Sequence, residues 1–290
     1  MPNNTALPPV PEDRYLNLAQ GRFCLRRWHG EGPLLLCLHG WQDNAASFAP
    51  LAGCGLNLLA LEFAGHGHSG HYPPGMSYAL ADHLMDLLDV LDALDESPQA
   101  VLGHSLGGAV ASLAAAARPE AIPTLILIEA LGPMSGADHD AVERLRRAAE
   151  ARRQSQQPRP RRTVDLDSAV AARRRAGPDD ALAARLLVER NLLATPEGLR
   201  WRSDPRIRLP SPWRLAESTI QSLVQSIEQP VLLLCGRESQ LPVYARERAE
   251  KLPRQADIRL LPGDHHLHMS QPQAVTDEIR RFLSKPESPG

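Results

Sequence analysis

The stretch AVLGHSLGGAVASLAA, residues 100–115, decides the fold class. It opens with an apolar run typical of a buried strand and closes with small residues typical of a buried helix. Between them lies Ser105, with Gly103 and Gly107 two residues away on either side. This G-x-S-x-G pattern predicts a sharp strand–turn–helix, because bulky side chains at the glycine positions would collide with the turn. A nucleophilic Ser105 would lie at the apex in strained backbone; the alternative is a serine that only caps the helix.

Short apolar runs along the chain, including the one before Ser105, predict a buried sheet. The runs lie at 33–40, 56–63, 100–105, 123–130, 230–236 and 256–263. Their apolar residues follow one another instead of alternating, which fits parallel strands covered on both faces. Amphipathic stretches separate the runs, and this alternation predicts a doubly wound α/β sheet. Residues 14–30 alternate more and contain a glycine turn, which predicts an antiparallel hairpin at the sheet edge.

The strand–helix alternation breaks between residues 131 and 228, where Arg, Ala, Gln and Pro dominate. Helical patches occur in this segment at 140–153, 179–193 and 216–227. This break predicts a helical cap inserted after the sixth strand. The predicted organisation is a tail at 1–13, a core at 14–134 and 228–285, a cap at 135–227 and a tail at 286–290. Ligands in open α/β sheets bind at the carboxyl ends of the strands, so a cap inserted there would cover the site. A solvated helical appendage is the alternative.

Composition and length exclude several classes of protein. The 290 residues are 43% hydrophobic, which suits one domain with a sizeable core and an insertion. No run of about 18 apolar residues is present, so no membrane span is predicted. The first residues lack the basic and apolar segments of a signal peptide, and the four cysteines lack metal-binding spacing. We therefore expect a cytoplasmic protein without a metal site.

Arginine is concentrated between residues 143 and 214, which raises the question of a nucleic-acid or membrane surface. Lysine occurs only twice in the chain, so arginine supplies nearly all of the positive charge throughout. Aspartate and glutamate are also interspersed in the same segment. Compositional bias therefore explains the basic segment, and nucleic acid is not predicted as a partner.

Four motifs together resemble the α/β-hydrolase superfamily. They are HGW at 39–41, GHGHS at 65–69, GHSLGG at 103–108 and GDHHLHMSQPQAV at 263–275. The resemblance covers about residues 14–134 and 228–285, which leaves out the predicted cap. Within the superfamily, HGWQDNAASF at 39–48 is similar to the serine-hydrolase-like (kraken-type) branch, whose members are regarded as esterases with few known substrates.

The resemblance implies positions for the oxyanion hole and the general base. One oxyanion donor is the N–H after the nucleophile, which is Leu106 here, and the other is the N–H of Trp41 in the loop after an earlier strand. The resembling families place a proline seven positions after the catalytic histidine. Counting back from Pro272 gives His265 as the base, with His266 as the alternative.

The acid departs from the common family pattern. Many relatives carry aspartate at the position of Ser239, and a neutral hydroxyl cannot stabilise the imidazolium formed during catalysis. Glu238 could replace it by a one-residue shift. Glu129, however, ends the apolar run 123–130, where an unpaired buried carboxylate would cost several kcal/mol. An imidazole partner would remove that cost, and certain haloalkane dehalogenases place their acid after this strand. We predict Glu129, with Glu238 or pairing of Glu129 to a cap arginine as alternatives.

A Ser–His–Glu set with two backbone donors performs acyl transfer. Serine at position 105 argues against dehalogenase and epoxide-hydrolase chemistry, because those relatives carry aspartate there. The prediction is hydrolysis of a carboxylic ester, thioester or small amide of a small-molecule acyl substrate, with no cofactor. A C–C bond hydrolase on the same fold and a non-catalytic binding protein are the alternatives. A homodimer is left open.

Overall fold

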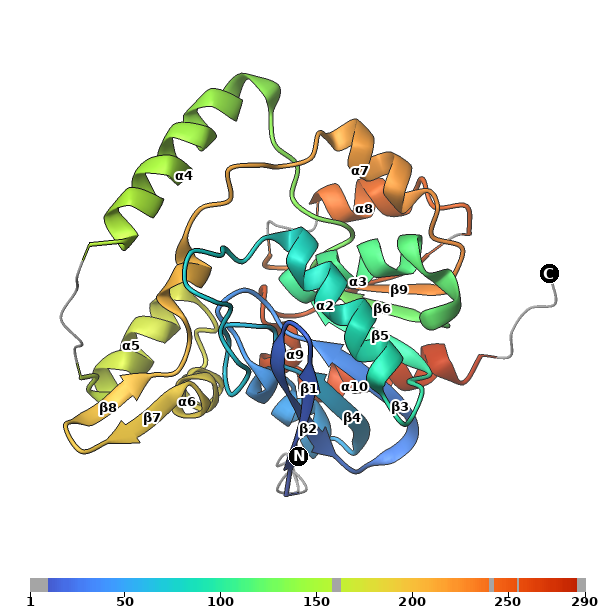
Figure 1. Ribbon diagram of the computed structural model, residues 1–290. Coiled ribbons are helices and arrows are strands. Elements are labelled where there is room, and N and C mark those ends of the chain that lie inside the picture. Colours follow the sequence, from blue (N-terminus) through green and yellow to red (C-terminus); the bar gives the residue numbers. More distant parts are fainter. Residues whose placement is uncertain (1–9, 158–162, 240–242, 255, 286–290) are drawn as a thin grey trace.

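The computed structural model describes residues 10–157, 163–239, 243–254 and 256–285 (Figure 1). Within these ranges the main sheet contains β1 (Glu12–Leu18), β2 (Gly21–Trp28), β3 (Glu31–Leu38), β4 (Leu56–Leu61), β5 (Ala100–His104), β6 (Leu125–Ile128), β9 (Val231–Gly236) and β10 (Asp257–Leu261). Their spatial order is β1-β2-β4-β3-β5-β6-β9-β10. The six predicted apolar runs correspond to β3, β4, β5, β6, β9 and β10, so each of these strands is confirmed.

Most of the sheet is parallel. The pairs β4–β3, β3–β5, β5–β6, β6–β9 and β9–β10 all run parallel. β1 and β2 form an antiparallel hairpin, and β2 pairs antiparallel with β4. The edge hairpin and the mostly parallel α/β sheet are therefore as predicted. All parallel strands end at one edge of the sheet, which brings the loops after β3, β5, β6 and β9 together there.

Both faces of the sheet are buried because its strands are apolar at successive positions. In β3, Leu36 and Leu38 belong to one hydrophobic cluster, and Leu35 and Cys37 belong to the cluster on the opposite face. All four side chains have no exposed surface. Successive residues of a strand point to opposite faces of the sheet. Because both faces are covered by apolar clusters, β3 is apolar at every one of these positions.

Two helical layers cover these faces. The first cluster includes residues of α2 (Leu80–Ala93), α3 (Leu106–Ala117), α7 (Glu217–Val224) and α8 (Val243–Ala249). The second includes residues of α1 (Ala49–Gly53), α9 (Leu267–Ser270) and α10 (Pro272–Leu283). Proline occupies the first turn of α10, where its missing N–H costs no helical hydrogen bond. In the described residues, no helix is both long and apolar enough to cross a membrane.

The segment between β6 and β9 is a long insertion between two neighbouring strands of the main sheet, and it has its own helices and a small hairpin. They are α4 (Ala141–Ser155), α5 (Leu166–Ala176), α6 (Ala181–Arg190), β7 (Leu192–Thr195), β8 (Gly198–Trp201) and α7. Short 3₁₀ helices are η1 (Ala45–Phe48), η2 (Pro119–Ala121), η3 (Asp138–Asp140) and η4 (Pro205–Arg208). Figure 1 shows α4 standing away from the sheet, and α4 buries none of its described residues. The helical patches expected here match α4, α6 and α7, whereas α5 and the β7–β8 hairpin were not predicted.

The domain boundaries differ in two places from those expected. β1 begins at Glu12, two residues inside the predicted tail 1–13, and residues 1–9 and the predicted tail 286–290 lie outside the described residues. At the other boundary, Ile220 and Val224 of α7 join the main hydrophobic core. The predicted cap 135–227 therefore includes a helix that packs against the sheet layer.

Candidate active site

The turn between β5 and α3 holds Ser105 in unusual backbone. Its φ is 52° and its ψ is −112°, a combination that costs a residue with a Cβ of order 1–3 kcal/mol. A Cβ at Gly103 would lie 2.5 Å from the Gly107 carbonyl oxygen, and one at Gly107 would lie 2.0 Å from the Leu38 carbonyl oxygen. Glycine at these two positions is thus a steric requirement of the turn. The N-terminus of α3 begins at Leu106, directly after the serine, and carries partial positive charge.

Glu129 lies directly after β6, beside this turn. The backbone N–H of Ser105 donates to the Ile128 carbonyl at 3.0 Å, which places the serine next to the residue that precedes Glu129. The Glu129 side chain is buried, with 1% of the residue exposed. Its Oε1 accepts a hydrogen bond from the Gly236 N–H at 2.6 Å, and its Oε2 lies 3.3 Å from His265 Nδ1. Glu129 and His265, both predicted as site residues, are therefore brought together.

Ser239 occupies the position where many relatives were expected to carry the acid. Its hydroxyl donates a short hydrogen bond to Glu129 Oε2, the oxygen that faces His265. Glu238, the alternative acid, instead accepts a hydrogen bond from the Gly263 N–H and is solvent-exposed. No arginine of the described residues pairs with Glu129. The loop after β9 thus supports Glu129 through a donor and supplies no second carboxylate to His265.

The loop after β10 positions three histidines differently. The His265 carbonyl accepts a hydrogen bond from His104 Nε2 at 2.9 Å, and His104 is the residue before Ser105. With Nδ1 toward Glu129, Nε2 is the nitrogen left to face a substrate. His266 Nε2 lies 3.5 Å from Asp43 Oδ2, and His268 Nε2 shares a hydrogen bond with the Ser47 hydroxyl at 2.7 Å. His266 and His268 are thus engaged elsewhere. Among the described residues, the Ser105 hydroxyl and His265 are not joined by a hydrogen bond.

The loop after β3 contains the predicted oxyanion donor Trp41. In the described part of the chain, neither the backbone N–H of Trp41 nor that of Leu106, the first residue of α3, has a hydrogen-bond partner. His39 braces this loop: its Nδ1 contacts the Gly40 carbonyl at 2.8 Å, and its Nε2 accepts from the Phe63 N–H at 3.2 Å. Burial lowers the pKa of His39 to about 4, so it is neutral at pH 7.

A buried polar cluster lies behind the site. Asp43, His104 and His266 each offer one potential metal-ligand atom, and these atoms lie within 4.8 Å of one another. Arg173 from α5 already pairs with Asp43 Oδ1. Burial alone would raise the pKa of Asp43, but the imidazoles of His104 and His266, each 3.5 Å from Asp43 Oδ2, and the Arg173 charge hold it well below its usual range. We assign the cluster an ion-pair role, because Arg173 supplies the cation that Asp43 needs.

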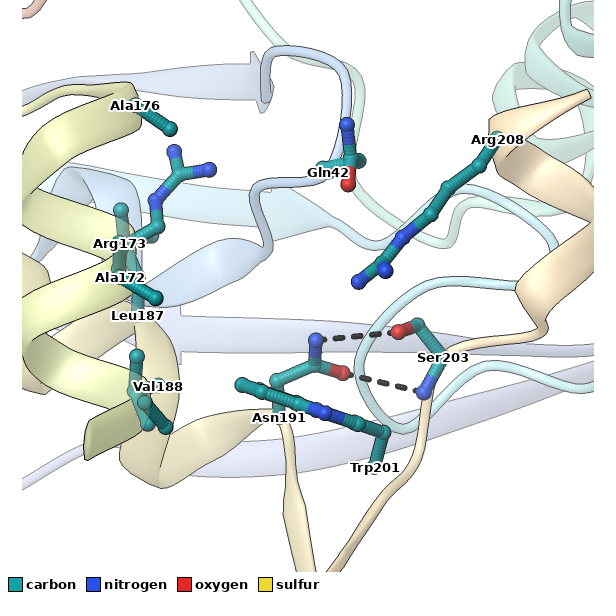
Figure 2. A pocket seen from close by; sticks show the side chains of 11 residues that line it. Gln42, Ala172, Arg173, Ala176, Leu187, Val188, Asn191, Trp201, Ser203 and Arg208 are labelled. Carbon is teal, nitrogen blue, oxygen red and sulfur yellow. Dashed lines mark hydrogen bonds between the residues drawn. The ribbon is translucent and has the colours of Figure 1, made fainter. Parts of the chain in front are cut away.

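Two cavities lie where the inserted segment meets this edge of the sheet. An open depression of about 570 Å³ is lined by both His265 and His266, together with Asp264, Asp179 and residues 174–177 at the end of α5. A more enclosed cavity of about 180 Å³ lies between Gln42, α5, α6 and η4 (Figure 2). Ala176 lines both, so the cavities adjoin. Ser105 itself does not line either of them.

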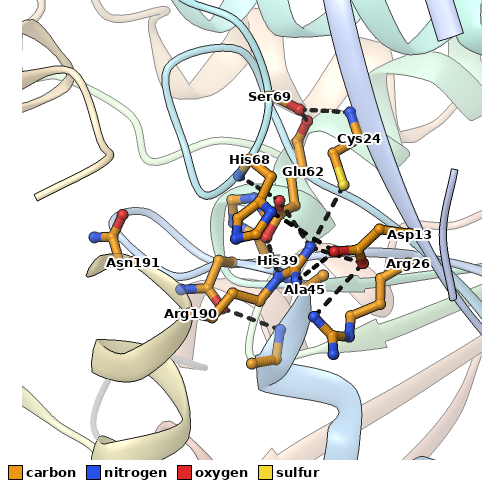
Figure 3. A network of polar contacts seen from close by, with 12 residues as sticks. Asp13, Cys24, Arg26, His39, Ala45, Glu62, His68, Ser69, Arg190 and Asn191 are labelled. Carbon is orange, nitrogen blue, oxygen red and sulfur yellow. Dashed lines mark hydrogen bonds and ion pairs between the residues drawn. The ribbon is translucent and has the colours of Figure 1, made fainter. Parts of the chain in front are cut away.

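A buried ion network fastens α6 to the core (Figure 3). Arg190, the last residue of α6, donates to Glu62 at 2.7 Å and to Asp13 of β1 at 3.1 Å. Glu62 has no exposed surface, and it also accepts hydrogen bonds from the backbone N–H groups of Ala45 and His68. A Cβ at Gly67 would lie 2.2 Å from Glu62 Oε1, so glycine makes room for this carboxylate. Sequence analysis missed the network, and the charged Glu62 directly after an apolar strand was the available signal.

Comparison with known proteins defines the class. A family model described as the alpha/beta hydrolase family matches residues 35–278, so the chain belongs to that family. Within the family it belongs to the serine-hydrolase-like branch. A probable serine hydrolase of Drosophila melanogaster is 30% identical and aligns over 89% of this chain and 84% of its own length. A serine hydrolase-like protein of Danio rerio is 29% identical over 89% of this chain and 83% of its own.

Solved structures agree with this assignment. The structure of a hypothetical protein from Pseudomonas aeruginosa PAO1 has a TM-score of 0.85 at 37% identity and covers 94% of this chain and 100% of its own. A thioesterase domain from the curacin biosynthetic pathway has a TM-score of 0.78 at 26% identity, with coverage of 95% and 100%. The α/β-hydrolase fold predicted from the elbow motif is thereby confirmed.

Proposed function

We propose that the protein hydrolyses a carboxylic ester, a thioester or a small amide through an acyl-enzyme on Ser105. His265 is the general base, Glu129 orients it, and the backbone N–H groups of Trp41 and Leu106 form the oxyanion hole. The observation that carries this proposal is the 3.3 Å contact between Glu129 and His265 beside the strained Ser105 turn. Similarity to a thioesterase domain supports acyl-transfer chemistry.

The reaction follows from these roles. His265 Nε2 takes the Ser105 proton as the hydroxyl attacks the substrate carbonyl, and the imidazolium formed is stabilised by Glu129. The negative charge on the carbonyl oxygen is held by the two N–H groups at the α3 N-terminus and the β3 loop. His265 then protonates the leaving group, and water attacks the acyl-enzyme with His265 again as base. The proposal requires Ser105 Oγ and His265 Nε2 to come within hydrogen-bond distance during the reaction.

We further propose that the inserted segment acts as a cap over this edge of the sheet. Three contacts support a fixed position for its inner part. Arg173 of α5 pairs with Asp43, the Leu187 carbonyl of α6 accepts from the Asn44 amide at 2.8 Å, and Arg190 reaches Glu62. The first two contacts join α5 and α6 to the loop that follows β3, and the third joins α6 to the residue that follows β4.

Labelling with a fluorophosphonate probe tests the proposed function. The wild-type protein is expected to be labelled, and Ser105→Ala is not. Folded wild-type protein that resists labelling and hydrolyses no p-nitrophenyl ester would favour the alternative of a binding protein on a hydrolase fold.

A further inference from the structure

We propose that the 180 Å³ cavity binds a carboxylate carried by the substrate, and that Arg208 is the residue that recognises it. This inference rests on the proposed hydrolase function and deepens it by naming a substrate class: anionic acyl esters, thioesters or amides. The cavity is smaller than the ~300–1,000 Å³ of typical ligand pockets, so it would hold one substituent of the substrate.

The backbone around η4 aims Arg208 at the cavity. The Asp204 side chain caps η4 by accepting from the Arg206 N–H, and the Arg206 guanidinium binds Asp204 and three carbonyls, those of Tyr72, Pro73 and Met76. Arg206 is thus fully used in holding the turn. Two residues later, the Arg208 guanidinium lines the cavity, and Figure 2 shows it reaching toward Asn191 and Ser203.

The charge of this cavity is not balanced. Its lining contains two arginines and no aspartate or glutamate. Arg173 is neutralised by Asp43. Arg208 is solvent-exposed at the rim of the cavity, and neither an ion pair nor a hydrogen bond connects its guanidinium to another residue in the described ranges. A guanidinium that lines a concave site without a partner favours an anionic ligand, and its planar donors match a carboxylate in two-point contact.

The other lining groups complete a site for one carboxylate on an apolar stem. The Asn191 amide donates to the Ser203 hydroxyl at 3.1 Å and accepts from the Ser203 N–H at 3.1 Å, which fixes that hydroxyl and leaves its hydrogen to donate. Gln42 adds an amide from the opposite side. The remaining wall is mostly apolar and is formed by Ala169, Ala172, Ala176, Leu187, Val188 and the Trp201 side chain.

Two connections relate this cavity to the reacting groups. The indole Nε1 of Trp41 donates to the Ile207 carbonyl at 2.8 Å, so the predicted oxyanion residue is bonded to the residue before Arg208. On the other side, Ala176 lines both the cavity and the depression that contains His265. A substrate that fills the cavity with one end can therefore extend toward His265 with the other.

The test compares esters with a six-carbon acyl chain that differ in whether and where they carry a carboxylate. The mono-p-nitrophenyl ester of adipic acid and p-nitrophenyl hexanoate have equal chain lengths, and the hexanoate of a carboxylated nitrophenol places the charge on the leaving group. We expect wild-type kcat/KM to favour one of the two anionic esters over the neutral one. Arg208→Gln should lower this anionic-to-neutral ratio by roughly 10–100-fold, the scale of one charge-assisted hydrogen bond. Arg208→Lys should retain part of the preference.

Arg214→Gln provides the matched control, because it removes the same charge from an exposed arginine that does not line the cavity. It should leave the ratio unchanged. Equal kcat/KM for all three esters would overturn the inference, and so would an anionic-to-neutral ratio that Arg208→Gln does not alter. In either case, hydrolysis of the hexanoate would still support the proposed function. If no ester is hydrolysed, the proposed function fails and calorimetry decides the site. Adipate binding to wild type that is lost in Arg208→Gln supports it, and no adipate binding to wild type rejects it.

Discussion

Glu129 Oε2 lies 3.3 Å from His265 Nδ1, although 136 positions separate the two residues in the chain. The contact forms because β6 and β9 are parallel neighbours, and the loops after β6, β9 and β10 therefore share one edge. Glu129 has a φ of 62°, so the chain turns sharply as soon as the strand ends. Both Glu129 oxygens are occupied, Oε1 by the Gly236 N–H and Oε2 by the Ser239 hydroxyl and His265. This environment holds the carboxylate in one orientation.

Neutralising Glu129 should reduce catalysis without unfolding the protein. Glu129→Gln is expected to lower kcat by roughly 10³ to 10⁴-fold, because an amide can no longer stabilise the imidazolium. The matched change Glu238→Gln should leave kcat near that of the wild type, since Glu238 contacts the Gly263 N–H and not the histidine. Steady-state kinetics on a p-nitrophenyl ester measure both. A large loss in Glu238→Gln together with an active Glu129→Gln would reverse the assignment.

A carboxylate at position 239, after β9, should partly replace the one at position 129, after β6. Ser239 donates to the Glu129 oxygen that faces His265, so a carboxylate at position 239 in the absence of Glu129 would lie near the same nitrogen. Glu129→Ala/Ser239→Asp is expected to recover at least about tenfold in kcat relative to Glu129→Ala, through the restored charge on the imidazolium partner. Glu129→Ala/Ser239→Asn is the uncharged control. Equal activity in the two double variants would contradict the prediction.

Removing Arg190 should destabilise the protein far more than removing an exposed arginine of the same helix. Arg190→Met leaves Glu62 buried without its cation, which costs about 3–5 kcal/mol of unfolding free energy. Arg185→Met, which removes only exposed pairs with Asp167 and Glu189, should leave the unfolding free energy close to that of the wild type. Urea unfolding measures both.

The double variant Arg190→Met/Glu62→Gln separates charge from packing. Because it removes the uncompensated carboxylate, it should regain part of the stability lost in Arg190→Met. A double variant that is no more stable than the single one would show that lost packing, not the buried charge, dominates.

Stability should fall on acidification between about pH 6.5 and pH 4. Burial lowers the pKa of His39 and of His104 to about 4, and that of His83 to about 3. The unfolded chain, with histidine pKa near 6.5, therefore binds more protons in this window than the folded chain. The stabilising contribution is present above pH 6.5 and is lost as pH falls. Burial also holds the pKa values of His66 and His268 well below their usual range. It raises the pKa of Glu62 to about 7 and that of Asp86 to about 6, which opposes the trend in part of this window. Each buried histidine contributes at most about 1.4 kcal/mol per pH unit to the slope.

Urea unfolding at several pH values measures that slope. His83→Gln removes one of these groups and should reduce the slope by up to about 1.4 kcal/mol per pH unit. His29 is exposed, so His29→Gln should leave it unchanged. A slope that is identical in wild type and His83→Gln would contradict the burial argument.

The parts of the fold that were predictable depend on short stretches of sequence. The elbow around Ser105 was readable because glycine sterics act within four residues, and the strands because two-sided burial produces continuous apolar runs. Glu129 was predicted as the partner of the histidine by a physical argument, since a charge that ends an apolar run needs a partner. Its support from Ser239 could not be foreseen, because which hydroxyl faces it depends on the course of the loop after β9.

The inserted segment was less predictable for the same reason. Its hydrophobic pattern is weak: α4 buries no described residue, and α5 buries only Ala169. The contacts that position it are polar pairs between distant residues, such as Arg190 with Glu62, 128 positions apart. No periodicity of the local sequence indicates such a pair. The sequence therefore predicted an insertion, but not α5, the β7–β8 hairpin or the ion pair between Arg190 and Glu62.

The hydrogen bond from the Trp41 indole to the Ile207 carbonyl joins the loop after β3 to η4. Under the proposed roles, one end of this bond belongs to the oxyanion hole and the other to the turn that carries Arg208. A displacement of η4 that opens the cavity would break the bond and release the Trp41 side chain at the same time. Loading and chemical competence would then be gated together, with the pocket for the developing negative charge complete only when the turn has closed behind the substrate.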